Sequence, residues 1–453
     1  MTHNSGRVLA AHPNEDSTTL VTVHQTPKKA ALASLLGSTL EYYDFVIYGT
    51  AAALFFNKLF FPEGNAVVAM IASLASFGVA YVARPIGGLV MGHIGDSIGR
   101  KKALMITLVV MGIASVSIGL LPTYEQVGIW ATVLLFVCRI AQGFSAGAES
   151  AGASTMTMEH SPEGRRALFT SSVMIGCAVG NVLAGLVFMP FLALPEEQLM
   201  SWGWRIPFLL SAVVLGVAYF IRTELEEPEA VAVQAEQEEK ESSDLQLAEY
   251  APAVEVLKFH LGKVARVLFT TWFSIAQTGM NVYAMSYATQ IVGIERPTVV
   301  MTLIVGNAIS IVFIPIWAWL SDKYGRKPIL LFAAVFTCLT FWAFFSAANA
   351  QNIPMMMIWC GLNQGVFYAA WNGVWTVFFP EMFPAKVRYT GMAMGNQLGL
   401  ILVGFTPAIA TAIEARYQWV GVAVFVTLGL VVAAIAIATA KETAFTKLDD
   451  LGK

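Results

Sequence analysis

The sequence predicts an all-α polytopic membrane protein whose twelve spanning helices form two similar six-helix bundles. Three observations predict this fold: the chain is unusually apolar, its apolar segments recur at the length of a membrane span, and two motifs occur once in each half. The 453 residues are 57% hydrophobic and only 13% charged, with a mean hydropathy of +0.65. Soluble domains carry about 25% charged residues, so an ordinary soluble domain is excluded.

The apolar segments have the length of transmembrane helices, which need about 20 residues to cross a bilayer. Twelve such segments lie between charged or Gly- and Pro-containing breaks, at residues 30–55, 66–92, 103–121, 127–150, 168–193, 205–222, 264–292, 298–320, 329–349, 353–379, 388–413 and 417–440. Lysine and arginine in the short loops gather on one side, which is the side expected to face the cytoplasm. We therefore expect a multi-pass protein of the cell inner membrane with both termini in the cytoplasm.

One polar stretch interrupts this pattern and divides the chain into two sets of six spans. Residues 223–262 are rich in glutamate and have too little apolar surface to form a packed domain. The expected organisation is an N-terminal tail at 1–27, a first bundle at 28–222, an acidic cytoplasmic linker at 223–262, a second bundle at 263–440 and a C-terminal tail at 441–453.

Charge and residue spacing exclude several classes of partner. The net charge is −3 and no long basic run exists, so nucleic acid is not expected as a partner. Neither the six histidines nor the four cysteines have ligand spacing, so we expect no metal and no cofactor. Cys138, Cys177, Cys338 and Cys360 lie inside predicted helices and are expected to fill the core. The pattern contains no nucleophile, base and orienting group of an enzyme.

The first repeated motif is an Asp-x-x-Gly-Arg-Lys turn, found after the second span and again after the eighth. Its two copies contain Asp96, Gly99 and Arg100, and Asp322, Gly325 and Arg326. Glycine permits a tight turn, and the aspartate can accept hydrogen bonds from the positive N-terminal end of a neighbouring helix. We interpret the turns as inter-helix latches that hold one conformation. The alternative is loop charge that only sets the topology.

The second repeated motif lies between the fourth and fifth spans and again between the tenth and eleventh. It consists of Glu159, Pro162 and Arg166, which have the same spacing as Glu381, Pro384 and Arg388. Parallel repeats of this kind place a substrate site between the two halves near mid-membrane, and the halves rock to alternate access.

Ionisable residues deep in a span are costly and are therefore functional candidates. Asp44 and Arg139 lie about halfway through the first and fourth spans, so we expect them to share a depth and to pair. Protonation of Asp44 would free Arg139 to bind a substrate carboxylate, and the alternative is a permanent structural ion pair. Glu41 lies one helical turn before Asp44, so either carboxylate can carry the proton.

Two further charged residues lie nearer the cytoplasmic ends of their spans. Glu149 in the fourth span and Arg84 in the second are expected to gate or brace the inner mouth. For Arg84 the alternative is that its side chain reaches the membrane interface.

The deep polar residues of the second half are uncharged and alternate with aromatic residues. We expect this stripe to form a cavity wall that recognises hydroxyl or carbonyl groups, while charge and proton coupling belong to the first half. The residues chosen as substrate-binding are Gln277, Asn281, Tyr287, Gln364, Tyr368, Trp371 and Asn396. For any single aromatic residue the alternative is core packing or lipid contact.

The motifs carry a family resemblance. The repeated turns resemble the signature loop of the major facilitator superfamily, and residues 139–143 (RIAQG) resemble its fourth-helix motif. Four further segments resemble the metabolite:H+ symporter family, at residues 37–45 (GSTLEYYDF), 84–88 (RPIGG), 202–208 (WGWRIPF) and 380–391 (PEMFPAKVRYTG). That family includes carriers of shikimate, 2-oxoglutarate, citrate, proline and betaine. The resemblance implies the major facilitator fold and proton-coupled transport of a small organic acid.

The substrate expectation follows from the single central cation. With Arg139 alone, a monocarboxylate such as shikimate or a related cyclic hydroxy acid fits better than citrate. The chain departs from shikimate-like carriers at the end of the fourth span, where Ser150 follows Glu149 in place of tryptophan. The alternatives are a proton-driven exporter, disfavoured by Asn181 where the exporter motif has proline, and a non-transporting sensor of the same fold. We expect the protein to act as a monomer.

Overall fold

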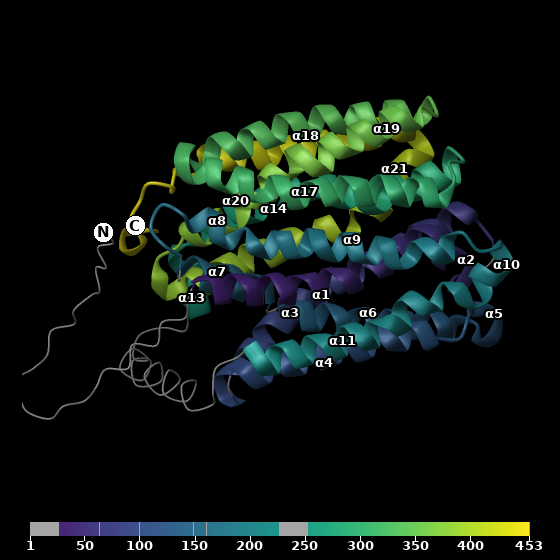
Figure 1. Cartoon of the computed structure of the whole chain (residues 1–453), viewed down its shortest axis with the longest axis horizontal. Helices are drawn as coiled ribbons and strands as arrows, with labels where there is room; N and C mark the ends of the chain where they lie inside the picture. Colours follow the sequence, from purple (N-terminus) through teal and green to yellow (C-terminus); the bar gives the residue numbers. More distant parts are fainter. Residues whose placement is uncertain are drawn as a thin grey trace, which may run out of the picture.

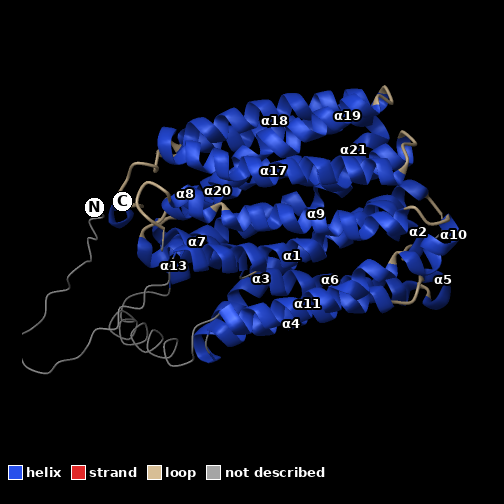
Figure 2. Ribbon diagram, viewed as in Figure 1, coloured by secondary structure: helices blue, strands red, loops and turns tan. Residues whose placement is uncertain are grey.

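The protein is a bundle of long helices that run along one common axis (Figure 1). The computed structural model describes residues 27–62, 64–98, 100–147, 149–159, 161–225 and 252–452. Within these residues the regular structure is helical and no strand is present (Figure 2). The expected N-terminal tail up to residue 26 and the centre of the acidic linker, 226–251, lie outside the described residues.

We call the described residues 27–225 the N half. Its helices are α1 Pro27–Leu54, α2 Phe56–Leu59, α3 Ala66–Ile98, α4 Arg100–Leu120, α5 Tyr124–Val127, α6 Ile129–Ala146, α7 Glu149–Glu159, α8 Arg166–Thr170, α9 Ser172–Leu192, α10 Glu196–Gln198, the π-helix Leu199–Gly203 and α11 Arg205–Leu225. The fourth span, formed by α6 and α7, is longer than the sequence predicted. Helices α8 and α9 together form the fifth span.

We call residues 252–452 the C half. Its helices are α13 Pro252–Phe259, α14 Leu261–Thr271, α15 Ile275–Thr278, α16 Ala284–Ser286, α17 Arg296–Tyr324, α18 Arg326–Asn349, α19 Ile353–Cys360, α20 Tyr368–Glu381 and α21 Arg388–Thr439, with 3-10 turns at Trp272–Ser274, Ala385–Val387 and Leu448–Asp450 and π-helical turns at Gly279–Tyr283, Tyr287–Ile291 and Gly361–Phe367. Helix α21 covers the last two predicted spans, which meet at Gln418, a residue with φ of 56°.

Each of the first ten predicted spans corresponds to one helix or to a run of consecutive helices, and the last two share α21. Seven helices of the described part are long and apolar enough to cross a membrane. Five of the twelve predicted spans are not counted separately. Helix α21 joins two spans, the seventh and tenth spans are divided by π-helical and 3-10 turns, α1 is not among the seven, and the third span has only a shorter apolar helix, Met105–Leu120.

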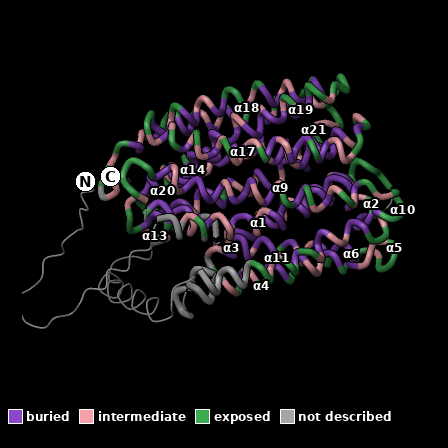
Figure 3. Tube along the Cα trace, in the orientation of Figure 1, coloured by how far each residue is buried: buried purple, intermediate pink, exposed green. Residues whose placement is uncertain are grey.

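Each long helix has a buried face directed into the bundle and an exposed face on the outside (Figure 3). The exposed faces carry apolar residues such as Val213 and Val335. An apolar outer surface is what lipid requires. The halves pack along two seams, α9 against α17 and α3 against α21. Small residues bring helices close inside the N half, since a Cβ at Gly180 would contact the α1 backbone at Thr39.

Candidate functional site

A cavity lies between the two halves, and we call it the central cavity. Helices α1, α3 and α9 form its N-half wall, and the seventh, tenth and eleventh spans form its C-half wall. The polar and aromatic residues on the wall are Ser38, Glu41, Tyr42, Tyr81, Arg84, Ser274, Gln277, Thr278, Tyr368, Trp371, Asn372, Trp375 and Asn396. The two halves thus meet around a polar space, in the place where the repeat predicts a substrate site.

The charged feature of this wall is an ion pair between Glu41 on α1 and Arg84 on α3. The carboxylate Oε1 and the guanidinium Nη2 are 2.6 Å apart, and both side chains are at most 5% exposed. The guanidinium also lies over the rings of Phe45 and Tyr81, with 4.4 and 4.8 Å to the ring centroids. Its Nε has no hydrogen-bond partner among the residues that the structure describes. Arg84 therefore does not reach the membrane interface, and it lies beside the cavity.

The expected pair between Asp44 and Arg139 is wrong, since no ion pair joins these two described residues. Arg139 is fully buried and donates to the side-chain oxygen of Gln142 at 2.6 Å and to the Phe77 carbonyl at 2.9 Å. Asp44 instead accepts a hydrogen bond from the Ser211 hydroxyl at 2.6 Å. Shared depth gives the height of a residue in the bundle but not the neighbour that its helix face meets.

Close packing of α6 on α3 explains the position of Arg139. A Cβ at Gly143 would overlap the Ala80 backbone, so the two helices approach closely at this level. The guanidinium is consequently directed to α3 carbonyls and lies 3.8 Å from the centroid of the Tyr48 ring. Arg139 does not line the central cavity, and Arg84 is the arginine that does.

Four of the predicted substrate-binding residues lie on the C-half wall. Tyr368 donates its hydroxyl to the Gln277 side-chain oxygen at 3.2 Å, and Asn396 accepts from Thr271 at 3.2 Å. The Trp371 ring stacks on Phe273 with centroids 4.4 Å apart and an angle of 3°. These residues stand where a solute between the halves would meet them, and their role in binding stays a prediction.

Three other predicted residues do not line this cavity. Tyr287 donates to Asn349 at 2.8 Å, and Gln364 donates to Asn363 at 2.9 Å. The Asn281 side-chain oxygen is buried and has no hydrogen-bond partner in the described part of the chain. Each lies in a π-helical turn, at Gly279–Tyr283, Tyr287–Ile291 or Gly361–Phe367. A π-helical turn changes the spacing of residues on one face, so an extrapolation with the α-helical period assigns the wrong face.

We call the end of the bundle that holds Asp322 the latch end. Both oxygens of Asp322 accept backbone N–H bonds, from Ala167 and Leu168 at 3.0 Å, in the first turn of α8. Arg326 lies 2.7 Å from the same carboxylate. Gly325 has φ of +105°, a conformation that favours glycine. The second copy of the turn therefore makes the predicted contact with a helix N-terminus, and that contact joins the two halves.

The second repeated motif also joins the halves, by exchange of partners. Glu159 pairs with Arg388 at 2.9 Å, and Arg166 pairs with Glu381 at 3.2 Å. Each glutamate thus meets the arginine of the other copy. The equal spacing had indicated equivalent roles, but it did not predict this reciprocal pairing.

Sequence reasoning missed the part of the C-terminal tail that covers the latch end, residues 440–452, which we call the strap. Glu442 accepts backbone N–H bonds from Arg326 and Lys327 at 2.9 and 3.0 Å. Thr443 donates to Glu381 at 2.6 Å, and Arg166 donates to the Thr446 carbonyl at 2.7 Å. The position of Glu442 just after the last apolar segment was the available signal, but its partners are distant in sequence.

The remaining predicted latch and gate residues are not tested. Gly99 lies outside the described residues, and the side chains of Asp96, Arg100 and Glu149 are not among those that the structure describes.

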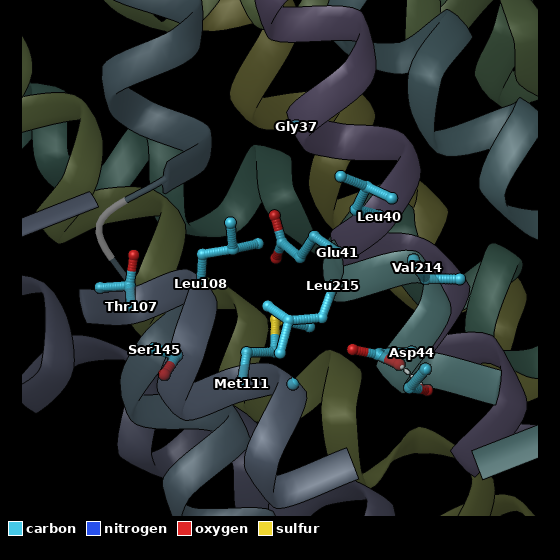
Figure 4. A pocket seen from close by; sticks show the side chains of 12 residues that line it. Gly37, Leu40, Glu41, Asp44, Thr107, Leu108, Met111, Ser145, Val214 and Leu215 are labelled. Carbon is cyan, nitrogen blue, oxygen red and sulfur yellow. Dashed lines mark hydrogen bonds between the residues drawn. The ribbon is translucent and has the colours of Figure 1, made fainter. Parts of the chain in front are cut away.

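A second cavity lies inside the N half, between α1, α4, α6 and α11, and we call it the N-half cavity. Its polar lining consists of Glu41, Asp44, Thr107, Ser145 and Ser211. Figure 4 shows the two carboxylates of α1 on this wall, with Thr107 and Ser145 on the opposite side. Both residues predicted to couple protons therefore line the same cavity.

Cys177 is buried in the core, as the sequence predicted, and it also lines the central cavity together with Glu41. Cys360 is fully buried in the C half and does not line that cavity.

Comparison with known proteins gives a consistent result. Residues 29–452 match the family described as sugar (and other) transporters. The chain is 33% identical to a shikimate transporter of Escherichia coli over 96% of this chain and 98% of that protein. It is 34% identical to a proline/betaine transporter of Escherichia coli over 92% of this chain and 84% of that protein. A xylose transporter structure from E. coli, described as partially occluded and inward open, aligns with a TM-score of 0.73 at 19% identity, over 93% of this chain and 100% of that one.

Proposed function

This chain belongs to the sugar (and other) transporter family of the major facilitator superfamily, and we propose that it carries a small organic acid into the cell together with protons. The fold and the family expected from the sequence are confirmed, and the protein is a membrane-embedded secondary transporter rather than an enzyme. Proton coupling, substrate and direction are the proposal. We further propose that it works as a monomer in the inner membrane with both termini in the cytoplasm.

The observation that carries the proposal is the buried Glu41–Arg84 pair on the wall of the central cavity. A carboxylate and a guanidinium 2.6 Å apart neutralise each other in low dielectric. Protonation of Glu41 removes its charge and leaves Arg84 as an uncompensated cation beside the cavity. A substrate carboxylate then replaces Glu41 as the partner of Arg84, since an unpaired buried charge is costly. Proton binding and anion binding thereby favour each other.

The cavity wall favours a monocarboxylate with an uncharged polar or cyclic body. Arg84 is the arginine on this wall, and the opposite wall offers the amides of Gln277 and Asn396 and the rings of Tyr368 and Trp371. One cation binds one carboxylate, while amides and aromatic rings suit hydroxyl groups and a ring face. Shikimate and related cyclic hydroxy acids have this chemistry. The relatives named for shikimate and for proline and betaine are almost equally similar, so identity does not choose between these substrates.

Alternating access requires contacts that form in one state and break in another. The Asp322 contact with α8 and the two exchanged Glu–Arg pairs join the halves at the latch end. In the proposed cycle they hold this end closed while the substrate enters from the other side, and they separate when the halves rock. The proposed direction of net transport is inward.

Uptake into proteoliposomes tests the proposal. The panel is shikimate, proline, glycine betaine, citrate and xylose, each offered with and without an inward proton gradient. We expect a monocarboxylate to accumulate with the gradient, and a protonophore to abolish the accumulation. Equal uptake with and without the gradient would contradict proton symport, and accumulation driven by an outward gradient would favour the exporter alternative.

The native cysteines test where the solute binds. Cys177 lines the central cavity, so a bound substrate should slow its alkylation by N-ethylmaleimide. Cys338, which is partly exposed and does not line this cavity, provides the control in the same molecule. Peptide mass spectrometry reads both sites. If no solute of the panel slows the alkylation of Cys177, the substrate does not bind in the central cavity.

A further inference from the structure

We propose that Asp44 and the N-half cavity form a proton route to Glu41 that is separate from the central cavity. This inference rests on the proposed proton symport. It assigns the two carboxylates of α1 different roles. Asp44 receives the proton first, and protonation of Glu41 then breaks its ion pair with Arg84.

The first observation is the placement of the two carboxylates relative to the two cavities. Glu41 lines both the central cavity and the N-half cavity, whereas Asp44 lines only the N-half cavity. The residues are three apart on α1, so they lie one helical turn from each other on nearly the same face. Glu41 is therefore the point where the two spaces meet.

The second observation is a polar lining in which one buried hydroxyl lacks a hydrogen-bond partner among the described residues. The Ser145 hydroxyl is buried, lines the N-half cavity and has no hydrogen-bond partner among the described residues. Thr107 and Ser211 add two more buried hydroxyls, from α4 and α11. Buried water occupies polar cavities where it finds two to four partners, and these hydroxyls with the two carboxylates supply them. Such water conducts protons between groups that do not touch.

The third observation is that the two carboxylates have different partners. Glu41 is paired with Arg84, and the other titratable groups that face it are Tyr42 on α1, Tyr81 on α3 and Cys177 on α9. Asp44 accepts from Ser211 and forms no ion pair with a described residue.

The charged and titratable groups that face Asp44 are Arg139 on α6 and Tyr43 on α1. Arg139 is held by Gln142 and the Phe77 carbonyl. From α4 and α11, hydroxyl and apolar side chains face Asp44 within the cavity. Asp44 is thus free to exchange a proton without breaking an ion pair.

The proposed step conserves charge and protons. A proton that enters the N-half cavity from solvent as hydronium binds the Asp44 carboxylate and leaves neutral water. The Asp44 acid then passes a proton through water to the Glu41 carboxylate. Asp44 returns to its anionic form, Glu41 becomes neutral, and Arg84 keeps its charge and loses its partner. The proton thus arrives from one side of Glu41 while the substrate carboxylate arrives at Arg84 from the other.

Reconstituted full-length protein with an internal pH dye separates proton movement from substrate movement. In Asp44→Asn we expect substrate-driven proton uptake to fall at least tenfold, while exchange of labelled for unlabelled substrate at equal pH continues and shows that the protein is folded. Ser145→Ala should slow proton uptake several-fold. Ser154→Ala is the matched control, because its hydroxyl is also buried and without a partner but lines neither cavity.

The outcomes distinguish this inference from the proposed function. If substrate moves no protons in the unaltered protein, or if a sodium gradient replaces the proton gradient, proton symport and the proton route both fail. If the unaltered protein moves protons and Asp44→Asn moves them equally fast, only the route fails.

Carbodiimide labelling gives a second readout that does not depend on transport. In Glu41→Gln protein, a hydrophobic carbodiimide should modify Asp44, and saturating substrate should not slow the reaction, because the two spaces are separate. Protection of Asp44 by substrate would overturn the separate route.

Discussion

The two buried arginines Arg326 and Arg84 lie in different surroundings. At the latch end, Arg326 donates through Nε and Nη2 to both oxygens of Glu381 at 3.1 Å, and through Nη1 to Asp322 at 2.7 Å. At the central cavity, Arg84 has one carboxylate partner, and its Nε has none. A fully partnered arginine holds helices in one arrangement, whereas a partly partnered arginine next to open space can exchange its partner.

The difference follows from what each arginine packs against. Arg326 lies where α17, α20 and the strap converge. It donates to Ser321 on α17, and Thr443 of the strap donates to Glu381 of α20, the carboxylate that Arg326 also contacts. Arg84 lies against the rings of Phe45 and Tyr81, which attract a cation without satisfying its N–H donors. The same side chain is therefore suited to a latch in one place and to a switch in the other.

The largest expected effect is that of Arg84→Ala. It removes the proposed anion site and breaks the buried Glu41–Arg84 ion pair, and breaking such a pair costs about 3–5 kcal/mol. We expect kcat/KM for uptake to fall by more than about 100-fold, since 1.4 kcal/mol corresponds to tenfold. Arg84→Lys keeps the charge but not the planar guanidinium, so it should retain part of the activity. Uptake with an unchanged KM in Arg84→Ala would show that Arg84 is a structural residue.

Glu381→Gln should shift the conformational equilibrium of the latch end towards the open state, without changing the substrate affinity of the closed state. Arg326, Arg166 and Thr443 share this carboxylate, and hydrogen bonds to a charged group are worth about 1.5–3 kcal/mol. We expect the open population of the latch end to rise roughly tenfold or more. Spin labels at the exposed positions Glu163 and Ala385, one in each half, report the opening as a longer distance. An unchanged distance distribution would contradict the latch assignment.

The sequence predicted the fold because span length and repeated loops are local properties. It also identified Glu41, Gln277 and Tyr368 as deep polar residues, because polarity within an apolar segment is visible without a structure. It did not predict that Glu41 pairs with Arg84, because depth along a helix says nothing about which neighbour each face meets. The π-helical turn at Gly361–Phe367 moved Gln364 off the cavity wall, and such turns leave no periodic signal.

The strap was beyond sequence reasoning for a different reason: its contacts form only when distant loops converge. Glu442→Ala removes the acceptor for two backbone N–H groups at the start of α18, a capping contact worth about 1–2 kcal/mol. We expect the Tm of the purified alanine variant to be several degrees below that of the unaltered protein. Glu442→Gln still accepts hydrogen bonds, so its Tm should fall less. If the alanine variant melts like the unaltered protein, the strap contributes nothing to the latch end.

The smallest effect separates two glutamines that the sequence had treated alike. Gln277 lines the central cavity and accepts from Tyr368, whereas Gln364 is buried against Asn363 away from that cavity. A neutral hydrogen bond is worth about 0.5–1.5 kcal/mol, so Gln277→Ala should raise KM by about two- to tenfold with little change in kcat. Gln364→Ala removes a buried amide that does not meet the solute, so it should lower the Tm and leave KM unchanged. Uptake kinetics of both variants test this prediction. A larger rise in KM for Gln364→Ala than for Gln277→Ala would mean that the solute binds outside the central cavity. The uncharged wall opposite Glu41 and Arg84 would then have been assigned to the wrong helix faces.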